Sequence, residues 1–328
     1  VGDIAAGVGF KEIATGDTLT DPSNFIILER ITFPEPVVQV AVEAKKQEDV
    51  DKLNLALAKM AEEDPTFSFH FSNETGQTII SGMGELHLEI ILDRLTREQK
   101  VECSKGRPQV AYKEALTATT IHREIYKKQT GGKGKFADIE FEIGPADTDT
   151  LGLQFVNEVK GGAIPAEFIP CVEKGFRNAM QNGILLGYPV SSLKIRLLDG
   201  SYHPVDSDAL AFETVANIAF REASKKSSPA LLEPIMKVEI VAPATYIGDV
   251  TGYITQRRGQ VLSMDTKGSL QIVTAETPLS EMFGFIGSLR NMTSGRGTFS
   301  MQFLKYALLP NDLADDVIYK TKGYKVSY

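Results

Sequence analysis

The sequence has 328 residues, of which 42 % are hydrophobic and 24 % are charged, and its net charge is −8 at pH 7. These proportions are typical of a soluble globular protein, and no apolar run of about 18 residues predicts a transmembrane helix. The two cysteines and four histidines are scattered along the chain, which argues against a disulfide framework and against a metal site. The acidic total also argues against a general nucleic-acid binder.

The N-terminal end carries no sequence signal for secretion. Val1-Gly2-Asp3-Ile4 lacks the basic segment and the following apolar segment of a signal peptide. The low cysteine content fits a reducing compartment, so we expect a cytoplasmic protein. The sequence starts without an initiator methionine, which favours a piece of a longer chain, although processing would leave the same sequence.

The first 108 residues divide into a short leading part and one folded unit. Residues 1–33 are rich in Gly and Thr and contain short apolar runs, which predicts the tail of a small β-barrel. Phe33-Pro34-Glu35-Pro36 is typical of a linker. From 34 to 108 the hydrophobic period switches between two and 3.6 residues. The expected order is strand 38–43, helix 50–60, strand 67–71, strand 78–81, helix 88–95 and a short strand around Val101.

A second stretch, residues 232–310, repeats this order. It predicts a strand from Val238, a helix at 247–254, strands at 259–265 and 270–274, a helix at 279–286 and a strand at 299–303. Both stretches therefore follow the β-α-β-β-α-β order of ferredoxin-like sandwiches. That order identifies a fold and leaves function open.

The segment between the repeats, residues 109–231, has a different pattern. Strands are expected near 109–116, 135–143 and 193–198, and helices near 170–182 and 209–225. Gly183 is expected to cap the first of these helices. The chain is thus predicted to be an α+β multidomain protein, with two ferredoxin-like sandwiches flanking a mixed α/β domain and a tail at 311–328.

One short segment is basic within this acidic chain. Residues 121–135 contain five basic residues against the single acid Glu124. Within this segment, Thr130-Gly131-Gly132-Lys133-Gly134-Lys135 connects two β-like segments. Glycines permit positive φ and a close backbone approach, and lysines contact phosphates. We predict an RNA-binding tip here, and the alternative is a flexible, solvated hairpin.

A second polar loop has the sequence Asp199-Gly200-Ser201-Tyr202-His203-Pro204-Val205-Asp206-Ser207. Asp199-Gly200 predicts a turn. Tyr202 and His203 could stack on RNA bases, or the loop could be a solvated surface. His203 and Asp206 could also form an acid–base pair with Ser201 or Ser207 as nucleophile. We rank RNA contact first, a solvated loop second and hydrolysis third.

No nucleotide-binding motif occurs in the chain. Gly-x-x-x-x-Gly-Lys-Ser/Thr, which cradles phosphates, is absent, because Gly134-Lys135 is followed by Phe136. We therefore expect no enzymatic activity of this chain. The glycines of Ser81-Gly82-Met83-Gly84 before the predicted helix could leave an anion site at its N-terminus, but a packing role is the simpler interpretation.

Seven strings, in this order and spacing, resemble the elongation factor G family of translational GTPases. The resemblance covers roughly residues 1–310, and ordered strings are far more specific than any one motif. The strings are Ser81-Gly82-Met83-Gly84-Glu85-Leu86-His87-Leu88-Glu89, Gly106-Arg107-Pro108-Gln109-Val110-Ala111-Tyr112, Gly161-Gly162-Ala163-Ile164-Pro165, Asp199-Gly200-Ser201-Tyr202-His203, Gln256-Arg257-Arg258-Gly259, Pro278-Leu279-Ser280-Glu281-Met282-Phe283-Gly284 and Gly295-Arg296-Gly297-Thr298.

The resemblance implies the end of domain II at 1–33, domain III at 34–108, domain IV at 109–231 and domain V at 232–310. Domain IV would resemble the second domain of ribosomal protein S5. The GTPase domain, with its GTP and Mg, would be missing, so no cofactor is expected here. The protein would bind the ribosome as a monomer, contacting ribosomal RNA of both subunits and stalk-base proteins, and domain IV would hold the tRNA–mRNA duplex at the decoding centre.

The same resemblance implies which residues form the RNA-binding tip of domain IV. His203 would lie at the apex of the second loop. The implied contact residues are Gly131, Gly132, Lys133, Gly134, Lys135, Tyr202, His203 and Asp206.

The sequence departs from the family pattern at the tip and at the end. The family tip commonly reads Gly-Gly-x-Gly-Gln-Tyr-Gly, whereas Lys135-Phe136-Ala137 fills its last three places here, and Pro204 stands where an acid is common. Residues 319–328 match no family string. The resemblance implies GTP-driven translocation as the function of the parent, and these departures leave recycling, ribosomal protection or a specialised paralogue role open.

Overall fold

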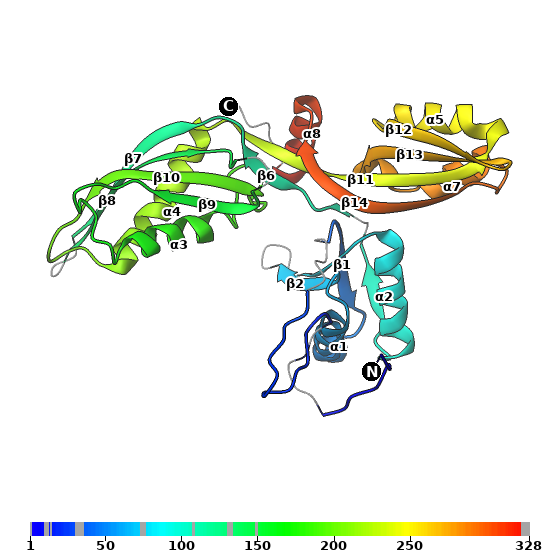
Figure 1. The fold of residues 1–328 in the computed structure, drawn as a ribbon, viewed down its shortest axis with the longest axis horizontal. Coiled ribbons are helices and arrows are strands. Elements are labelled where there is room, and N and C mark those ends of the chain that lie inside the picture. The colour runs from blue at the N-terminus through cyan, green and yellow to red at the C-terminus, as the bar shows by residue number, and fades with distance from the viewer. Residues whose placement is uncertain are drawn as a thin grey trace. The chain divides into compact units, whose positions relative to one another are not determined.

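The computed structural model describes residues 2–9, 13, 15–29, 36–72, 77–106, 109–129, 134–147 and 150–322. The chain forms two compact units, residues 1–111 with 234–305 and residues 112–233 with 306–328. Figure 1 shows the elements of both units, coloured along the chain.

The N-terminal repeat (residues 36–110) has the predicted order of elements. Alternation in the first strand places Val38, Val40 and Val42 in the core, where they meet the apolar helix faces that include Leu57 and Leu88. The antiparallel sheet has the order β2-β3-β1-β4, with β5 also paired to β1. Its elements are β1 (Val38–Ala44), η1 (Gln47–Asp49), α1 (Val50–Glu63), β2 (Ser68–Ser72), β3 (Gln77–Gly82), α2 (Glu85–Arg97), β4 (Cys103–Lys105) and β5 (Gln109–Val110).

The C-terminal repeat (residues 234–305) has the same topology, with strand order β12-β13-β11-β14. Ile240, Val250, Val273 and Leu289 are among its fully buried side chains. The strand β11 starts before the repeat, and its first residues pair with β6. Its elements are β11 (Pro229–Pro243), η2 (Ala244–Tyr246), α5 (Ile247–Gln256), β12 (Gln260–Lys267), β13 (Leu270–Pro278), α6 (Leu279–Met282), α7 (Phe285–Met292) and β14 (Thr298–Leu308).

The helix predicted at 279–286 is wrong as one continuous helix. It is interrupted between α6 and α7, where Phe283 is extended and Gly284 has φ +70°. Arg257 donates from Nη1 to the carbonyls of Glu281 and Phe283. The Arg257 guanidinium thus satisfies carbonyls that have no partner inside the helix. The interruption between α6 and α7 is therefore accompanied by a hydrogen-bond donor from outside residues 279–292.

The central domain (residues 112–233) is a four-stranded sheet of order β7-β8-β10-β9, in which only the pair β9–β10 is parallel. Figure 1 shows α3 and α4 on one side of this sheet. Phe141, Phe176, Phe212 and Phe220 are buried there. Its elements are β6 (Lys113–Leu116), β7 (Thr120–Lys128), β8 (Lys135–Gly144), β9 (Gly152–Asn157), α3 (Ile169–Ala179), β10 (Ser192–Ser201) and α4 (Ala209–Lys226).

Two local predictions in the central domain are wrong because glycine serves close packing there. Gly200 lies inside β10, opposite Ile139, and forms no turn. A Cβ on Gly200 would lie 2.3 Å from the carbonyl oxygen of Asp138. Gly183 does not cap α3, which ends at Ala179. A Cβ on Gly183 would lie 2.2 Å from the Glu114 carboxyl carbon.

The C-terminal end of the chain differs from expectation, whereas the barrel tail predicted at the N-terminal end stays a prediction. The described residues among 1–33 form turns and no strand. A barrel strand needs hydrogen-bonded neighbours, and here Phe25 and Ile27 remain exposed. The predicted tail contains the helix α8 (Asn311–Lys322), whose Ile318 is buried against the central domain at Leu231. No helix in the described ranges is long and apolar enough to span a membrane.

Candidate functional site

The described end of the Thr130–Lys135 loop lies next to the Ser201–Asp206 loop, at one end of the central domain (Figure 1). One loop follows β7 and leads into β8, and the other follows β10 and leads into α4. The amide of Gly134 donates to Asp206 Oδ1 at 3.0 Å, and the amide of Phe136 donates to the Asp206 carbonyl at 2.8 Å. The structure thus brings together Gly134, Lys135 and the His203 loop, while Gly131, Gly132 and Lys133 lie outside the described residues.

Ser207 forms a second link between these loops. Its hydroxyl donates to the Phe136 carbonyl at 2.7 Å and accepts from the His203 amide at 2.9 Å. The Ser207 amide donates to the His203 carbonyl at 3.0 Å. The loop carrying His203 is therefore closed on itself and attached to the start of β8.

His203 and Tyr202 are both exposed side chains of this loop. The His203 side chain is 52 % exposed, and Tyr202 is 44 % exposed. His203 Nδ1 accepts from the amides of Val205 at 3.3 Å and Asp206 at 3.1 Å. One edge of the imidazole is therefore used inside the loop, and the opposite edge is available to a partner.

The geometry argues against a hydrolase at this site. His203 Nδ1 lies 3.4 Å from Asp206 Oδ2, but neither candidate serine pairs with the ring. The hydroxyl of Ser201 donates to Asp138 Oδ2 at 2.7 Å, and that of Ser207 donates to the Phe136 carbonyl. A nucleophile must lie within hydrogen-bond reach of its base, and both hydroxyls are held elsewhere.

The positive charge of the tip is distributed differently from the sequence count. Lys135 Nζ lies 3.1 Å from Asp208 Oδ2, and Arg123 Nη2 lies 2.7 Å from Asp138 Oδ2. Lys127 and Lys128 are exposed on β7 and form no ion pair within the described ranges. Among the described cations of the hairpin, these two lysines are therefore available to a polyanion. They are not among the contact residues predicted from the sequence.

Asp138 anchors the base of the tip. Its side chain is only 3 % exposed, and it accepts from Arg123 Nε and Nη2 and from Ser201. Burial by itself raises the pKa of Asp138, but the hydrogen bonds from Arg123 and Ser201 and the positive charge of Arg123 outweigh burial. The pKa therefore lies below the ordinary value for an aspartate.

We expect Asp138→Asn to destabilise the central domain by about 1–3 kcal/mol at pH 7, because an ionised acceptor of three hydrogen bonds is lost. Because the pKa of Asp138 is lower in the folded state, its ionised form stabilises the fold at every pH above the unfolded-state pKa of about 3.9. This stabilisation is lost as the pH falls through the folded-state pKa. The difference between variant and wild type should therefore shrink below about pH 4. Hydrogen exchange of the β8 and β10 amides measures this stability difference between Asp138→Asn and wild type. A stability difference that persists unchanged in acid would refute the role of the Asp138 charge.

The Ser81–Gly84 segment supports the packing interpretation. A Cβ on Gly82 would lie 2.7 Å from Leu88 Cδ2. His87 Nδ1 accepts from the Met83 amide at 3.1 Å, and its Nε2 lies 2.9 Å from Asp64 Oδ2. These contacts attach the start of α2 to the sheet and to the end of α1.

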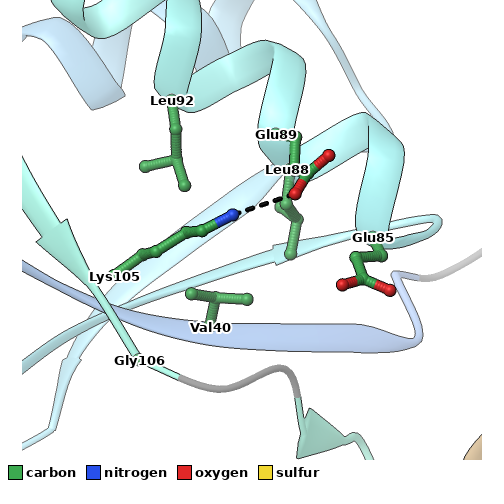
Figure 2. A pocket seen from close by; sticks show the side chains of 7 residues that line it. All are labelled: Val40, Glu85, Leu88, Glu89, Leu92, Lys105 and Gly106. Carbon is green, nitrogen blue, oxygen red and sulfur yellow. Dashed lines mark hydrogen bonds and ion pairs between the residues drawn. The ribbon is translucent and has the colours of Figure 1, made fainter. Parts of the chain in front are cut away.

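A groove of about 390 Å³ lies on the N-terminal repeat, between α2 and the strands β1 and β4 (Figure 2). Lys105 Nζ points along the groove to Glu89 Oε1 at 2.9 Å. None of its lining residues carries a hydroxyl, thiol or imidazole, so the groove offers no nucleophile of the serine, cysteine or histidine type. The lining residues are Val40, Glu85, Leu88, Glu89, Leu92, Lys105 and Gly106. Within the described residues, no group of three His, Cys, Asp or Glu side chains could hold a metal ion.

Two curated relatives are similar to this chain over almost its whole length. The elongation factor G of Amoebophilus asiaticus (strain 5a2) is 58 % identical over 322 residues, which are 98 % of this chain and 45 % of the relative. The elongation factor G of Cytophaga hutchinsonii is 56 % identical over 326 residues, which are 99 % of this chain and 46 % of the relative. The chain thus spans slightly less than half the length of these relatives.

A solved structure has the same fold. A crystal structure of a Thermus thermophilus protein matches 94 % of this chain and 46 % of its own chain, with a TM-score of 0.72 and 34 % sequence identity. Three family models match in succession: elongation factor G domain III at residues 33–107, domain IV at 108–228, and the elongation factor G C-terminus at 230–317. The chain therefore belongs to the elongation factor G family, of which it carries domains III, IV and the C-terminal domain.

Proposed function

We propose that this chain binds the ribosome as part of a longer elongation factor G and contributes to the GTP-driven translocation of tRNA and mRNA. The central domain would reach the tRNA–mRNA duplex with its tip (residues 130–135 and 201–207). GTP and Mg would bind a GTPase domain, which none of the three matched family models describes. The proposal extends to contacts with ribosomal RNA of both subunits and stalk-base proteins, and to a monomer working in the cytoplasm.

One observation carries this proposal. In a chain of net charge −8, two exposed lysines on β7 lead into a hairpin that is hydrogen-bonded to the loop presenting His203 and Tyr202. Lysines neutralise phosphates, and exposed aromatic rings stack on unpaired bases. An acidic body with one cationic, aromatic end favours contact with RNA at one place over contact along its whole surface.

Translocation and a specialised paralogue role are the two candidates within the family. Lys135-Phe136-Ala137 replaces the residues that the family pattern would lead us to expect at this position, and Lys135 is engaged by Asp208. This departure is the observation that favours a paralogue with a different ribosomal task, such as recycling or ribosomal protection. A translocation assay with the full-length parent separates them, since only a translocase advances mRNA by one codon per GTP-dependent round.

The first test is a ribosome pull-down with this chain at about 50 and about 200 mM salt. The proposal expects binding at the lower salt and a steep loss at the higher salt, because released counterions drive the association. Retention that does not depend on salt, or no retention at either concentration, would count against a phosphate-contacting tip in this chain.

A further inference from the structure

We propose that Asp206 is the positioning residue of the tip, joining the glycine loop to the His203 loop and fixing the His203 ring so that Nε2–H is its outward hydrogen-bond donor. This inference rests on the proposed function only for the identity of the partner, which is an RNA acceptor atom: a phosphate oxygen, a 2′-hydroxyl or a base acceptor.

Asp206 uses three different groups to connect the two loops. Its carboxylate accepts from the Gly134 amide at 3.0 Å, and its carbonyl accepts from the Phe136 amide at 2.8 Å. Its own amide donates to His203 Nδ1 at 3.1 Å. One residue thus contacts both the end of the glycine loop and the imidazole, although 72 positions separate it from Gly134 in sequence.

The absence of a side chain at position 134 leaves room for the close approach of Asp206 to the glycine loop. Gly134 is buried, and a Cβ there would lie 3.1 Å from Asp206 Cγ and 3.2 Å from Oδ2. A side chain at position 134 would therefore require the Asp206 carboxylate to shift by a few tenths of an ångström. The tight contact gives the third glycine of the motif a packing reason inside the protein.

The hydrogen bonds of His203 define the tautomer of its neutral ring. Amides of Val205 and Asp206 both donate to Nδ1, and a nitrogen that accepts hydrogen bonds carries no proton. The proton of the neutral imidazole therefore lies on Nε2. The side chain is half exposed, so the tip presents a directed N–H donor that an acceptor on RNA fits.

Asp206 Oδ2 also lies 3.4 Å from Nδ1, which raises the opposite tautomer as a competitor. In that form Nδ1–H would donate to the carboxylate, but it would also face two amide hydrogens. Two amide donors at 3.1 and 3.3 Å outweigh one longer contact at 3.4 Å, because hydrogen bonds weaken steeply with distance and misalignment.

Nitrogen-15 NMR of the histidine-labelled chain at a pH where the ring is neutral tests the tautomer directly. His203→Gln identifies the His203 signals among the four histidines. We expect Nδ1 of the wild type to have the shift of an unprotonated, accepting nitrogen and Nε2 that of a protonated one. The reverse assignment would overturn the proposal, whether or not the chain binds ribosomes.

Two variants of Asp206 test its role in positioning. Asp206→Ala removes the acceptor of the Gly134 amide, so exchange of that amide should become about tenfold faster or more. Asp206→Asn keeps an accepting oxygen and should restore most of the protection. Unchanged exchange of the Gly134 amide in Asp206→Ala would overturn the proposal, as would an Asp206→Asn variant with no more protection than Asp206→Ala.

Ribosome affinity of the same variants separates this proposal from the proposed function. We expect Asp206→Ala to weaken binding of the chain to ribosomes and Asp206→Asn to restore most of it. Equal affinity of Asp206→Ala and wild type would overturn the link between positioning and RNA contact. A wild-type chain that does not bind ribosomes would instead contradict the proposed function, while the NMR and exchange experiments would still decide the role of Asp206.

Discussion

Replacing Glu114 with alanine should destabilise the central domain by about 3 kcal/mol or more, because several buried donors at about 1–3 kcal/mol each lose their acceptor. Glu114 is 1 % exposed. Its carboxylate accepts from the amides of Leu185, Leu186, Gly187 and Tyr188 at 2.8–3.2 Å. The variant leaves these partly or fully buried donors without their acceptor, and each unsatisfied donor is costly. The expected result is fast hydrogen exchange at the four amides.

Two other substitutions serve as comparisons. Glu114→Gln retains one carbonyl oxygen and turns an NH2 group toward amide donors, so we expect an intermediate loss of stability. Glu140→Ala removes a carboxylate that is 34 % exposed and 3.5 Å from Arg123, and it should cost less than about 1 kcal/mol. Equal exchange rates for the 185–188 amides in Glu114→Ala and Glu140→Ala would contradict the role of Glu114 as the acceptor of these amides.

Replacing Lys127 and Lys128 together with alanine should lower the salt dependence of ribosome binding by up to about two units of log K against log salt. Both side chains are exposed on β7 and have no ion pair within the described ranges, so each can release counterions by contacting a phosphate. The measurement is affinity at several salt concentrations, with the variant and wild type compared as slopes.

A matched control removes the same charge elsewhere. Lys46→Ala with Lys59→Ala also deletes two exposed lysines that have no ion pair within the described ranges, but these lie in the N-terminal repeat. The slope should then stay close to that of wild type. If both double variants lowered the slope equally, net charge alone would explain the effect and the tip would have no special role.

The two other tip lysines, Lys133 and Lys135, give a further test of the salt dependence. We expect Lys133→Ala with Lys135→Ala to lower the slope by about two units at most. Lys135 already lies 3.1 Å from Asp208, so Lys135→Ala alone should lower the slope less than Lys127→Ala alone. A larger effect of Lys135→Ala would show that the pair with Asp208 opens when RNA binds.

Periodicity predicted most elements because each period reports on burial along one face. Val38, Val40 and Val42 alternate as the strand requires, and Ile247, Val250 and Ile254 mark one helix face; all six are buried. The break at Gly284 could not be predicted in this way. The apolar register continues through it, and the guanidinium that satisfies the freed carbonyls comes from Arg257, 24 positions from Glu281.

The closeness of the two loops was predicted, but the ion pairs around them were not. The family resemblance implied that both loops lie at one tip, and Gly134 is hydrogen-bonded to Asp206; their contact with RNA stays a prediction. The sequence cannot reveal that Arg123 pairs with Asp138 or that Lys135 pairs with Asp208, since these partners are 15 and 73 positions apart. Counting charges therefore overestimated the free positive charge at Arg123 and Lys135 and gave Lys127 and Lys128 too little weight.

A photo-crosslinking residue at position 202, next to His203, tests the central claim most directly. Tyr202 is 44 % exposed, so the substitution should leave the fold intact. With ribosomes carrying tRNA and mRNA, we expect crosslinks from position 202 to tRNA, mRNA or small-subunit ribosomal RNA. The same probe at the exposed Lys59 of α1 should not give those tRNA and mRNA products. Crosslinks from position 202 to proteins alone, in complexes that are shown to form, would contradict an RNA-contacting tip.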